Sequence, residues 1–110
     1  MDAAVAAPDS HRVLMETDRV RVVEVVVEPG VREPVHTHRW PGVMWIDRPA
    51  RIRYYGESGD LELETPEWPE GESATTAPHR TEWMEPEGPH AVENVDEVAY
   101  HAIRVELKPT

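Results

Sequence analysis

Short runs of β-branched, aromatic and other apolar residues, one of them rich in valine, alternate with polar and turn residues along most of the chain. The longest covers residues 19–28 and stops at the turn signal Pro29-Gly30. β-Branched side chains favour extended structure, whereas Pro-Gly favours a turn. Similar short runs occupy residues 35–38, 43–46, 51–55, 61–64, 81–84 and 91–95. The pattern therefore predicts many short strands separated by turns.

The last run, residues 98–107, alternates most regularly. Successive side chains of a strand point to opposite sides, and one face of this run carries Ala99, His101, Ile103, Val105 and Leu107. We expect this face to point into the core. No segment combines the helical apolar period with helix caps, and eleven prolines also argue against long helices. Many short strands predict an all-β sandwich or barrel.

The composition sets the domain organisation. A chain of 110 residues fits one domain. Residues 1–10 lack the basic start of a signal peptide, and we expect a disordered or loosely ordered tail before a single domain of residues 11–110. The absence of cysteine excludes disulfides and thiolate metal sites. No apolar run is long enough for a membrane helix, so we expect a cytoplasmic protein.

The charge of the chain limits the classes of partner that it can bind. A net charge of -11 opposes binding to nucleic acid or to an anionic membrane. Between Arg53 and Arg80 there is no Lys or Arg, but there are seven acidic residues. The simplest interpretation is a solvated loop region, and a docking surface for a basic partner is the alternative.

Three histidines carry the candidate chemistry. His36 and His38 are two residues apart on an expected strand, so their imidazoles share one face. His90 follows Gly88-Pro89 much later in the chain and could join them from another strand. Imidazoles that converge from rigid strands suit one metal ion.

The segments around these histidines resemble the two sequence motifs of the cupin superfamily. The matching residues are Gly30, His36 and His38 in the first motif, and Pro86, Gly88, His90 and Asn94 in the second. The resemblance covers about residues 13–107. It implies a small single-domain cupin, an all-β jelly roll (double-stranded β-helix barrel) with a metal site in its mouth.

The resemblance is incomplete at the family's carboxylate ligand. The metal-binding Glu expected after the second histidine falls on Gly42 or Val43, and the usual glycine upstream of the second motif falls on Arg80. A three-histidine site without Glu is similar to that of certain cupin dioxygenases. Such a site is one charge more positive and would favour an anionic ligand, for which Gly42 would leave space.

We therefore expect His36, His38 and His90 to hold one divalent transition metal. Iron is the first candidate, and nickel, manganese, zinc and copper also accept imidazole. The alternative is a degenerate cupin whose histidines bind no metal. His101 would act beside the ligands as a hydrogen-bond donor or acid/base group, or would be hydrogen-bonded in the core. We expect solvent around His11 and His79.

Three further residues are expected at the substrate pocket. Trp40 follows the first motif in a turn and would roof the pocket or contact a dimer partner. Gly42 is the empty carboxylate position, and Trp45 would line or fill the barrel together with Tyr55 and Trp83.

A fold does not fix a function. The resemblance favours a metal-dependent oxygenase that acts on a small molecule, which the positive site would prefer as an anion. The alternatives are a non-catalytic small-ligand-binding cupin and a metal-assisted isomerase or lyase, in which His101 or a tyrosine moves protons. No obvious acid/base residue on the motif strands supports the isomerase.

The valine run also predicts a homodimer. Residues 20–27 are apolar on nearly both faces, and a barrel interior covers only one of them. A second copy would cover the other face and protect a strand edge. We expect residues 19–28 at or beside this interface.

Overall fold

The computed structural model describes residues 1–65, 68, 70–74 and 79–109. Over this part the chain forms one short helix and nine strands. They are α1 (Ala3–Ala6), β1 (His11–Glu16), β2 (Val20–Val27), β3 (His36–His38), β4 (Gly42–Arg48), β5 (Ile52–Gly56), β6 (Leu61–Glu64), β7 (Arg80–Met84), β8 (Glu87–Asn94) and β9 (Tyr100–Leu107). Among these residues, no helix has the length and hydropathy needed to cross a membrane.

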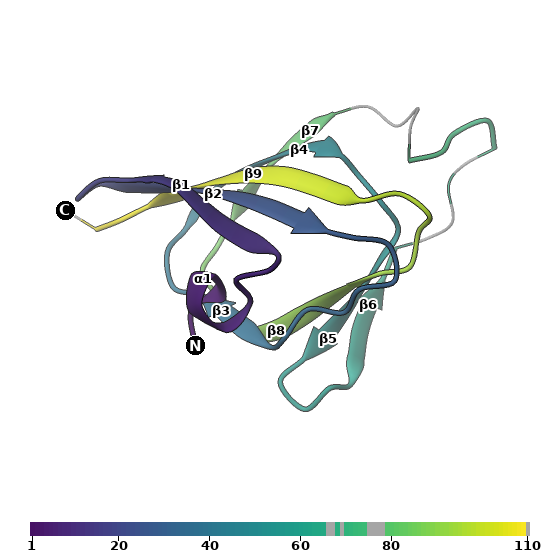
Figure 1. The fold of residues 1–110 in the computed structure, drawn as a ribbon, viewed down its shortest axis with the longest axis horizontal. Helices are drawn as coiled ribbons and strands as arrows, with labels where there is room; N and C mark the ends of the chain where they lie inside the picture. Colours follow the sequence, from purple (N-terminus) through teal and green to yellow (C-terminus); the bar gives the residue numbers. More distant parts are fainter. Residues whose placement is uncertain (66–67, 69, 75–78, 110) are drawn as a thin grey trace.

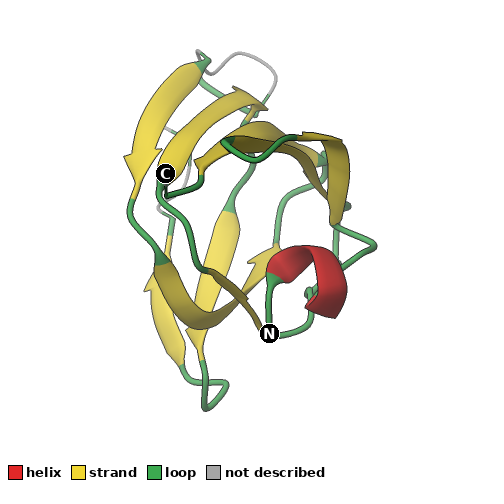
Figure 2. Cartoon of the chain, turned by 90° about the vertical axis from the view of Figure 1, so that its left-hand side faces the viewer, coloured by secondary structure: helices red, strands yellow, loops and turns green. Residues whose placement is uncertain are grey.

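The strands form two antiparallel sheets. The first has the order β1-β2-β9-β4-β7, and the second has the order β3-β8-β5-β6. Figure 1 shows the first sheet above the second, with α1 beside β3. Figure 2 shows that strands of both sheets curve around a common interior. The all-β prediction is confirmed.

The interior has an apolar end and a charged end. The apolar core contains Val23, Val25 and Val27 of β2, Met44 and Ile46 of β4, Ala50, and Tyr100 and Ala102 of β9. The same inward rows continue into buried charged residues, because Arg21 lies opposite Glu106 and Val23 lies opposite Arg104. This division places polar chemistry at one end of the space between the sheets.

The predicted inward face of the last strand is wrong. In β9 the buried residues are Tyr100, Ala102, Arg104 and Glu106, whereas His101 and its apolar neighbours point outward. Periodicity selects the more hydrophobic face as the buried one. Here the inner face carries charges that have buried partners, and the outer face is the more apolar one.

The N-terminal segment is packed, in contrast to the expected loose tail. Ala3 and Ala7 are each 1% exposed, and Ser10 and His11 are also buried. Asp2 caps α1 by accepting from the Ala4 N–H. Its carboxylate also accepts two hydrogen bonds from Arg21, of 2.9 and 3.0 Å. These partners are distant in sequence, so composition alone did not reveal them.

Two motif residues shape the chain around the second sheet. The amide nitrogen of Asn94, which is fully buried, donates to the carbonyl oxygens of Val27 and Val98 at 2.8 Å each. Gly30 has a φ of 78°, in the region that glycine adopts without strain, and its N–H donates to the Asn94 carbonyl. These bonds tie β2 and its following turn to β8, beside β3.

The outer face of the first sheet carries an apolar row beside the ion pairs of His101. Val22 lies opposite Val105, Val105 opposite Val43, and Val43 opposite Trp83, in one row across four strands. Trp45 and Trp83 are 44% and 55% exposed, so the expectation that they line the interior is wrong. This row includes the outer side of β2, the strand that we expected at an interface.

We propose that a second copy of the chain covers this outer face. Trp83→Glu should then convert a dimer into the 12.5 kDa monomer, because a charge buried at an apolar interface is costly. Leu61→Glu on β6 of the other sheet is the control and should leave the dimer intact. Light scattering at micromolar concentration measures the mass, and a monomeric wild-type protein would contradict the proposal.

Candidate metal centre

A cavity of about 370 Å³ lies between the sheets. One end carries four histidines, two glutamates and an arginine, which are His11, His36, His38, His90, Glu33, Glu87 and Arg104. The other end is formed mainly by apolar residues of β2, β4 and β5 together with Tyr100, and β7 adds the charged pair Arg80 and Glu82. The cavity therefore joins the two ends of the interior described above.

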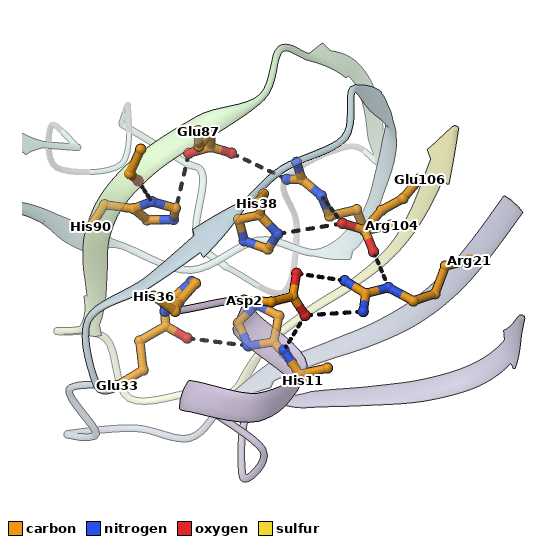
Figure 3. A network of polar contacts seen from close by, with 12 residues as sticks. Asp2, His11, Arg21, Glu33, His36, His38, Glu87, His90, Arg104 and Glu106 are labelled. Atoms are coloured by element: carbon orange, nitrogen blue, oxygen red, sulfur yellow. Dashed lines mark hydrogen bonds and ion pairs between the residues drawn. The ribbon is translucent and has the colours of Figure 1, made fainter. Parts of the chain in front are cut away.

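The structure brings the three predicted histidines together. His36 lies opposite His90 in the β3–β8 pair, and their ring centroids are 4.5 Å apart. The His38 ring is 5.1 Å from that of His36 and 5.3 Å from that of His90. Figure 3 shows these rings around the same space.

His11 joins the cluster and corrects the expectation that it lies in solvent. It lies inward on β1, opposite Val25, and is 5% exposed. Its ring centroid is 4.7 Å from that of His36 and 5.3 Å from that of His38. The packed N-terminal segment therefore supplies a fourth imidazole.

Hydrogen bonds determine which ring nitrogens are available. Nδ1 of His36 is 2.8 Å from the Pro34 carbonyl oxygen, and Nδ1 of His90 is 2.8 Å from that of Gly88. A carbonyl oxygen only accepts, so each Nδ1 carries the proton and each Nε2 has a free lone pair. Nε2 of His36 is buried and has no hydrogen-bond partner among the described residues. Metal-binding histidines commonly have this arrangement.

His11 is held by a buried serine and glutamate. Ser10 Oγ donates to Glu33 Oε2 at 2.7 Å and lies 2.9 Å from His11 Nδ1. When Glu33 is ionised it accepts the Ser10 hydroxyl proton, so His11 Nδ1–H donates to Ser10 Oγ and the Nε2 of His11 carries a lone pair. The backbone N–H of Val92 donates to the other Glu33 oxygen.

Two groups of side chains could hold a metal ion within this cluster. One contains His11, His36 and His38, and the other contains His38, Glu87 and His90; in each, the ligand atoms lie within 4.8 Å of one another. The predicted trio is therefore divided between two groups that share His38. Glu87 also offers a carboxylate in this cluster. The motif resemblance had placed the carboxylate ligand of the family at Gly42 or Val43 instead. Imidazole with carboxylate suits a divalent transition metal.

Gly42 is not an open position for a ligand. It lies on β4 opposite Glu106 of β9, and a side chain on Gly42 would collide with the Val105 carbonyl oxygen. Glu106 is fully buried, and its Oε2 is 3.7 Å from His38 Nδ1. A carboxylate therefore reaches this region from the neighbouring strand.

A chain of ion pairs surrounds the histidines (Figure 3). Asp2 binds Arg21, and Arg21 Nε donates to Glu106 Oε1 at 2.6 Å. Arg104 Nη1 donates to Glu87 Oε1 at 3.1 Å. The Tyr54 hydroxyl donates to the other Glu87 oxygen, and the Tyr54 ring stacks on His90 at 4.9 Å.

Burial fixes the protonation states that a metal site needs. It lowers the pKa of His11 to about 3 and that of His36 to about 4, and it also lowers the pKa of His90. Burial raises the pKa of Glu87. The Tyr54 hydrogen bond and the charge of Arg104 act in the opposite direction, and the net shift of this pKa is downward. Neutral imidazoles beside an ionised carboxylate are the forms that bind metal.

Glu33 differs from the other carboxylates. Burial raises its pKa to about 7, against the lowering effect of the hydrogen bonds from Ser10 and Val92. Its Oε1 lies 3.5 Å from His36 Nε2. The cavity thus contains a carboxyl group suited to proton transfer near neutral pH.

The other predicted site residues lie elsewhere. Trp40, Gly42 and Trp45 are not among the described residues that line the cavity. Trp40 is half-buried between cationic side chains, with Arg39 4.0 Å and Arg21 5.0 Å from its ring centroid. His101 lies on the outer face, where Nε2 is 2.9 Å from Glu24 and Nδ1 binds Asp47. It therefore cannot act on a ligand in the cavity.

Comparison with known proteins identifies the fold. No family model and no curated protein sequence matches the chain. A cupin domain from Bordetella pertussis is similar, with a TM-score of 0.68 and 16% identity over 90% of this chain and 92% of that one. The polyketide cyclase RemF from Streptomyces resistomycificus has a TM-score of 0.54 and 19% identity, over 88% of this chain and 63% of that one. The DMSP lyase DddQ from Ruegeria pomeroyi has a TM-score of 0.52 and 15% identity, over 84% of this chain and 40% of that one.

The chain therefore has the double-stranded β-helix fold of single-domain cupins, as its motifs predicted. It spans less than two thirds of the length of RemF and DddQ. At these identities the likeness shows the fold alone, and the site has to be judged from its own residues.

Gly42→Ala should destabilise the protein because the new methyl group would collide with the Val105 carbonyl oxygen. We expect a loss of about 3 kcal/mol in the free energy of unfolding, as for other overpacked positions. Gly88→Ala is the control, since a Cβ there meets no atom within 4 Å. Urea denaturation measures both, and equal stability of the two variants would show that Gly42 does have room.

The His101 ion pairs predict a pH-dependent stability. Burial lowers the pKa of His101, but hydrogen bonds to Glu24 and Asp47 raise it by more, so the net shift is upward from 6.5. A raised folded-state pKa stabilises the protein below the unfolded pKa, and this contribution is lost as the pH rises through the folded pKa. His101→Gln should therefore destabilise the fold more at about pH 5.5 than at about pH 9.

Urea denaturation at both pH values checks this prediction. His79→Gln, at an exposed histidine, is the matched control and should show little difference. A loss for His101→Gln that is equal at both pH values, or larger at the higher one, would contradict the assignment.

Proposed function

We propose that the chain is a metal-dependent enzyme that acts on a small molecule in the cavity between its sheets. The observation that carries this proposal is the set of free Nε2 atoms, created where Pro34, Gly88 and Ser10 fix the Nδ1 protons of three histidines. Without a metal, the buried Nε2 of His36 and Nδ1 of His38 have no hydrogen-bond partner among the described residues, which is costly. The donor set thus fits a divalent transition metal.

His38 would be the common ligand. The ion would take either His11 and His36 or Glu87 and His90 with it, depending on which of the two ligand groups it selects. A bound divalent ion would polarise an oxygen atom of the substrate. The protein residues would orient the substrate, exclude water and move protons.

Proton transfer is the reaction type that the cavity favours. Glu33 lines it with a carboxyl group that is 5% exposed and is held by Ser10 and Val92. The Tyr54 hydroxyl, bonded to Glu87, stands on the other side of His90. A positioned carboxyl group beside a metal suits lyase, isomerase or cyclase chemistry. A lyase and a cyclase are also among the proteins with this fold.

An oxygenase is the second candidate, and one feature favours it. The group His11, His36 and His38 contains no carboxylate, as the resemblance to three-histidine cupin dioxygenases suggested. Such a face leaves coordination positions open for two ligands. Oxygen consumption during turnover would identify the oxygenase, whereas exchange of substrate hydrogen with deuterated solvent under anaerobic conditions would identify proton transfer.

The metal site is tested by elemental analysis of protein purified without an affinity tag. His38→Ala should reduce bound metal to about a tenth or less, because both ligand groups contain His38. His36→Ala should do the same if the ion binds the all-histidine group, and His90→Ala should do so if it binds the group with Glu87. His101→Gln, on the outer face, should keep the wild-type content.

Two further variants identify the ligand group. Metal loss in His11→Ala but not in Glu87→Gln would assign the all-histidine group, and the reverse would assign the group with carboxylate. Equal metal content in the wild type and all the cluster variants would reject the proposed function.

A further inference from the structure

Arg104 is a buried cation whose hydrogen bonds are incomplete. Its side chain is 2% exposed, and it lines the cavity. A guanidinium has five N–H donors, but Nε and Nη2 of Arg104 have no hydrogen-bond partner among the described residues. Unsatisfied buried donors cost free energy, and a native protein keeps few of them.

The unsatisfied nitrogens are those that ordinarily bind a carboxylate. Nε and Nη2 lie on one edge of the planar group, and this edge matches the two oxygens of a carboxylate. The neighbouring carboxylates do not fill it. Glu87 binds the other nitrogen, Nη1, and Glu106 bonds Arg21 at 2.6 Å while its Oε2 stays 3.7 Å from Arg104 Nε.

The rest of the cavity selects the body of the ligand. Beyond Arg104, which lies opposite Met44 on β4, the inward residues of β2 and β4 are apolar and include Ile46 and Val25. The charged residues that β7 adds here, Arg80 and Glu82, pair with each other at 2.8 Å. A volume of about 370 Å³ accommodates a small molecule of this kind. An apolar group would pack against β2 and β4, at the opposite end from the histidines.

We propose that the substrate is a small monocarboxylic acid with an apolar body, and that Arg104 binds its carboxylate once a small shift of the buried guanidinium turns Nη2 and Nε toward the cavity. This inference rests on the proposed function only in calling the bound acid a substrate. The binding step itself needs only Arg104 and the cavity. The acid group would thereby be held next to the histidines and Glu33.

The test is isothermal titration of zinc-loaded protein with benzoate and isovalerate, and with the uncharged analogues benzamide and isovaleramide. We expect both acids to bind more tightly than their amides. Arg104→Met removes the guanidinium but keeps an apolar side chain of similar length, and it should weaken binding of the acids about tenfold or more. The control, Arg48→Met at an exposed arginine, should bind like the wild type.

Arg104→Lys shows whether the guanidinium edge matters beyond its charge, and it should also bind the acids more weakly. Circular dichroism and zinc content report whether each variant is folded and loaded. If Arg104→Met does not fold, the Arg104→Lys variant and the comparison of acid with amide decide the question.

The outcomes separate this inference from the proposed function. Zinc binding with equal affinity for acids and amides, or with unchanged acid affinity in folded Arg104 variants, would overturn the inference and leave the metal proposal standing. Failure to bind zinc would overturn the metal proposal. The same titrations on metal-free protein would then decide the carboxylate site, since preference for acids that depends on Arg104 would support it.

Discussion

The buried ion pairs at the polar end of the interior are the constraint on which the rest of the structure depends. Glu106 is fully buried and lies between Arg21 and Arg104. Removing one partner from such a set is strongly destabilising because it leaves an uncompensated charge. The bond from Arg21 to Asp2 extends the set to the N-terminus. It thereby holds the segment that carries Ser10 and His11, so the same charges that hold the sheets together also complete the histidine cluster.

The two ends of the cavity therefore have different roles. Burial at one end keeps the imidazoles neutral, and the Tyr54 hydrogen bond helps to keep Glu87 ionised; these are the forms that bind metal. Apolar residues at the other end would exclude water from a bound ligand. Glu33 lies among the histidines, and its neutral and ionised forms are both accessible near pH 7. The proposed metal site, the arginine proposed to bind an anion and an acid/base carboxyl group thus face the same space, which is the combination that a small-molecule enzyme needs.

Motif spacing predicted the fold and the convergence of His36, His38 and His90, because histidines at alternate positions on paired strands must share a face. Contacts between residues distant in the sequence explain the parts of the site that the motif spacing did not predict. His11 entered the cluster through contacts of Asp2 with Arg21, and Glu87 lay between two expected strands where the structure extends β8. The expected role of His101 was wrong because β9 buries Arg104 and Glu106 instead of its apolar face. Hydrophobic periodicity fails at a site that buries charge, because buried charges there serve the site and not the core.

The central claim is that hydrogen bonds to Nδ1 hold the histidine Nε2 atoms free for a metal ion. Nitrogen-15 NMR of the imidazoles tests it most directly, because the two neutral tautomers and a metal-bound nitrogen have different chemical shifts. In metal-free protein near neutral pH, His36 and His90 should be neutral with the proton on Nδ1. Added zinc should shift the Nε2 signal of whichever one belongs to the occupied ligand group, while the signals of His101 stay in place. Protons on Nε2 of His36 and His90, or no change with zinc, would contradict the account.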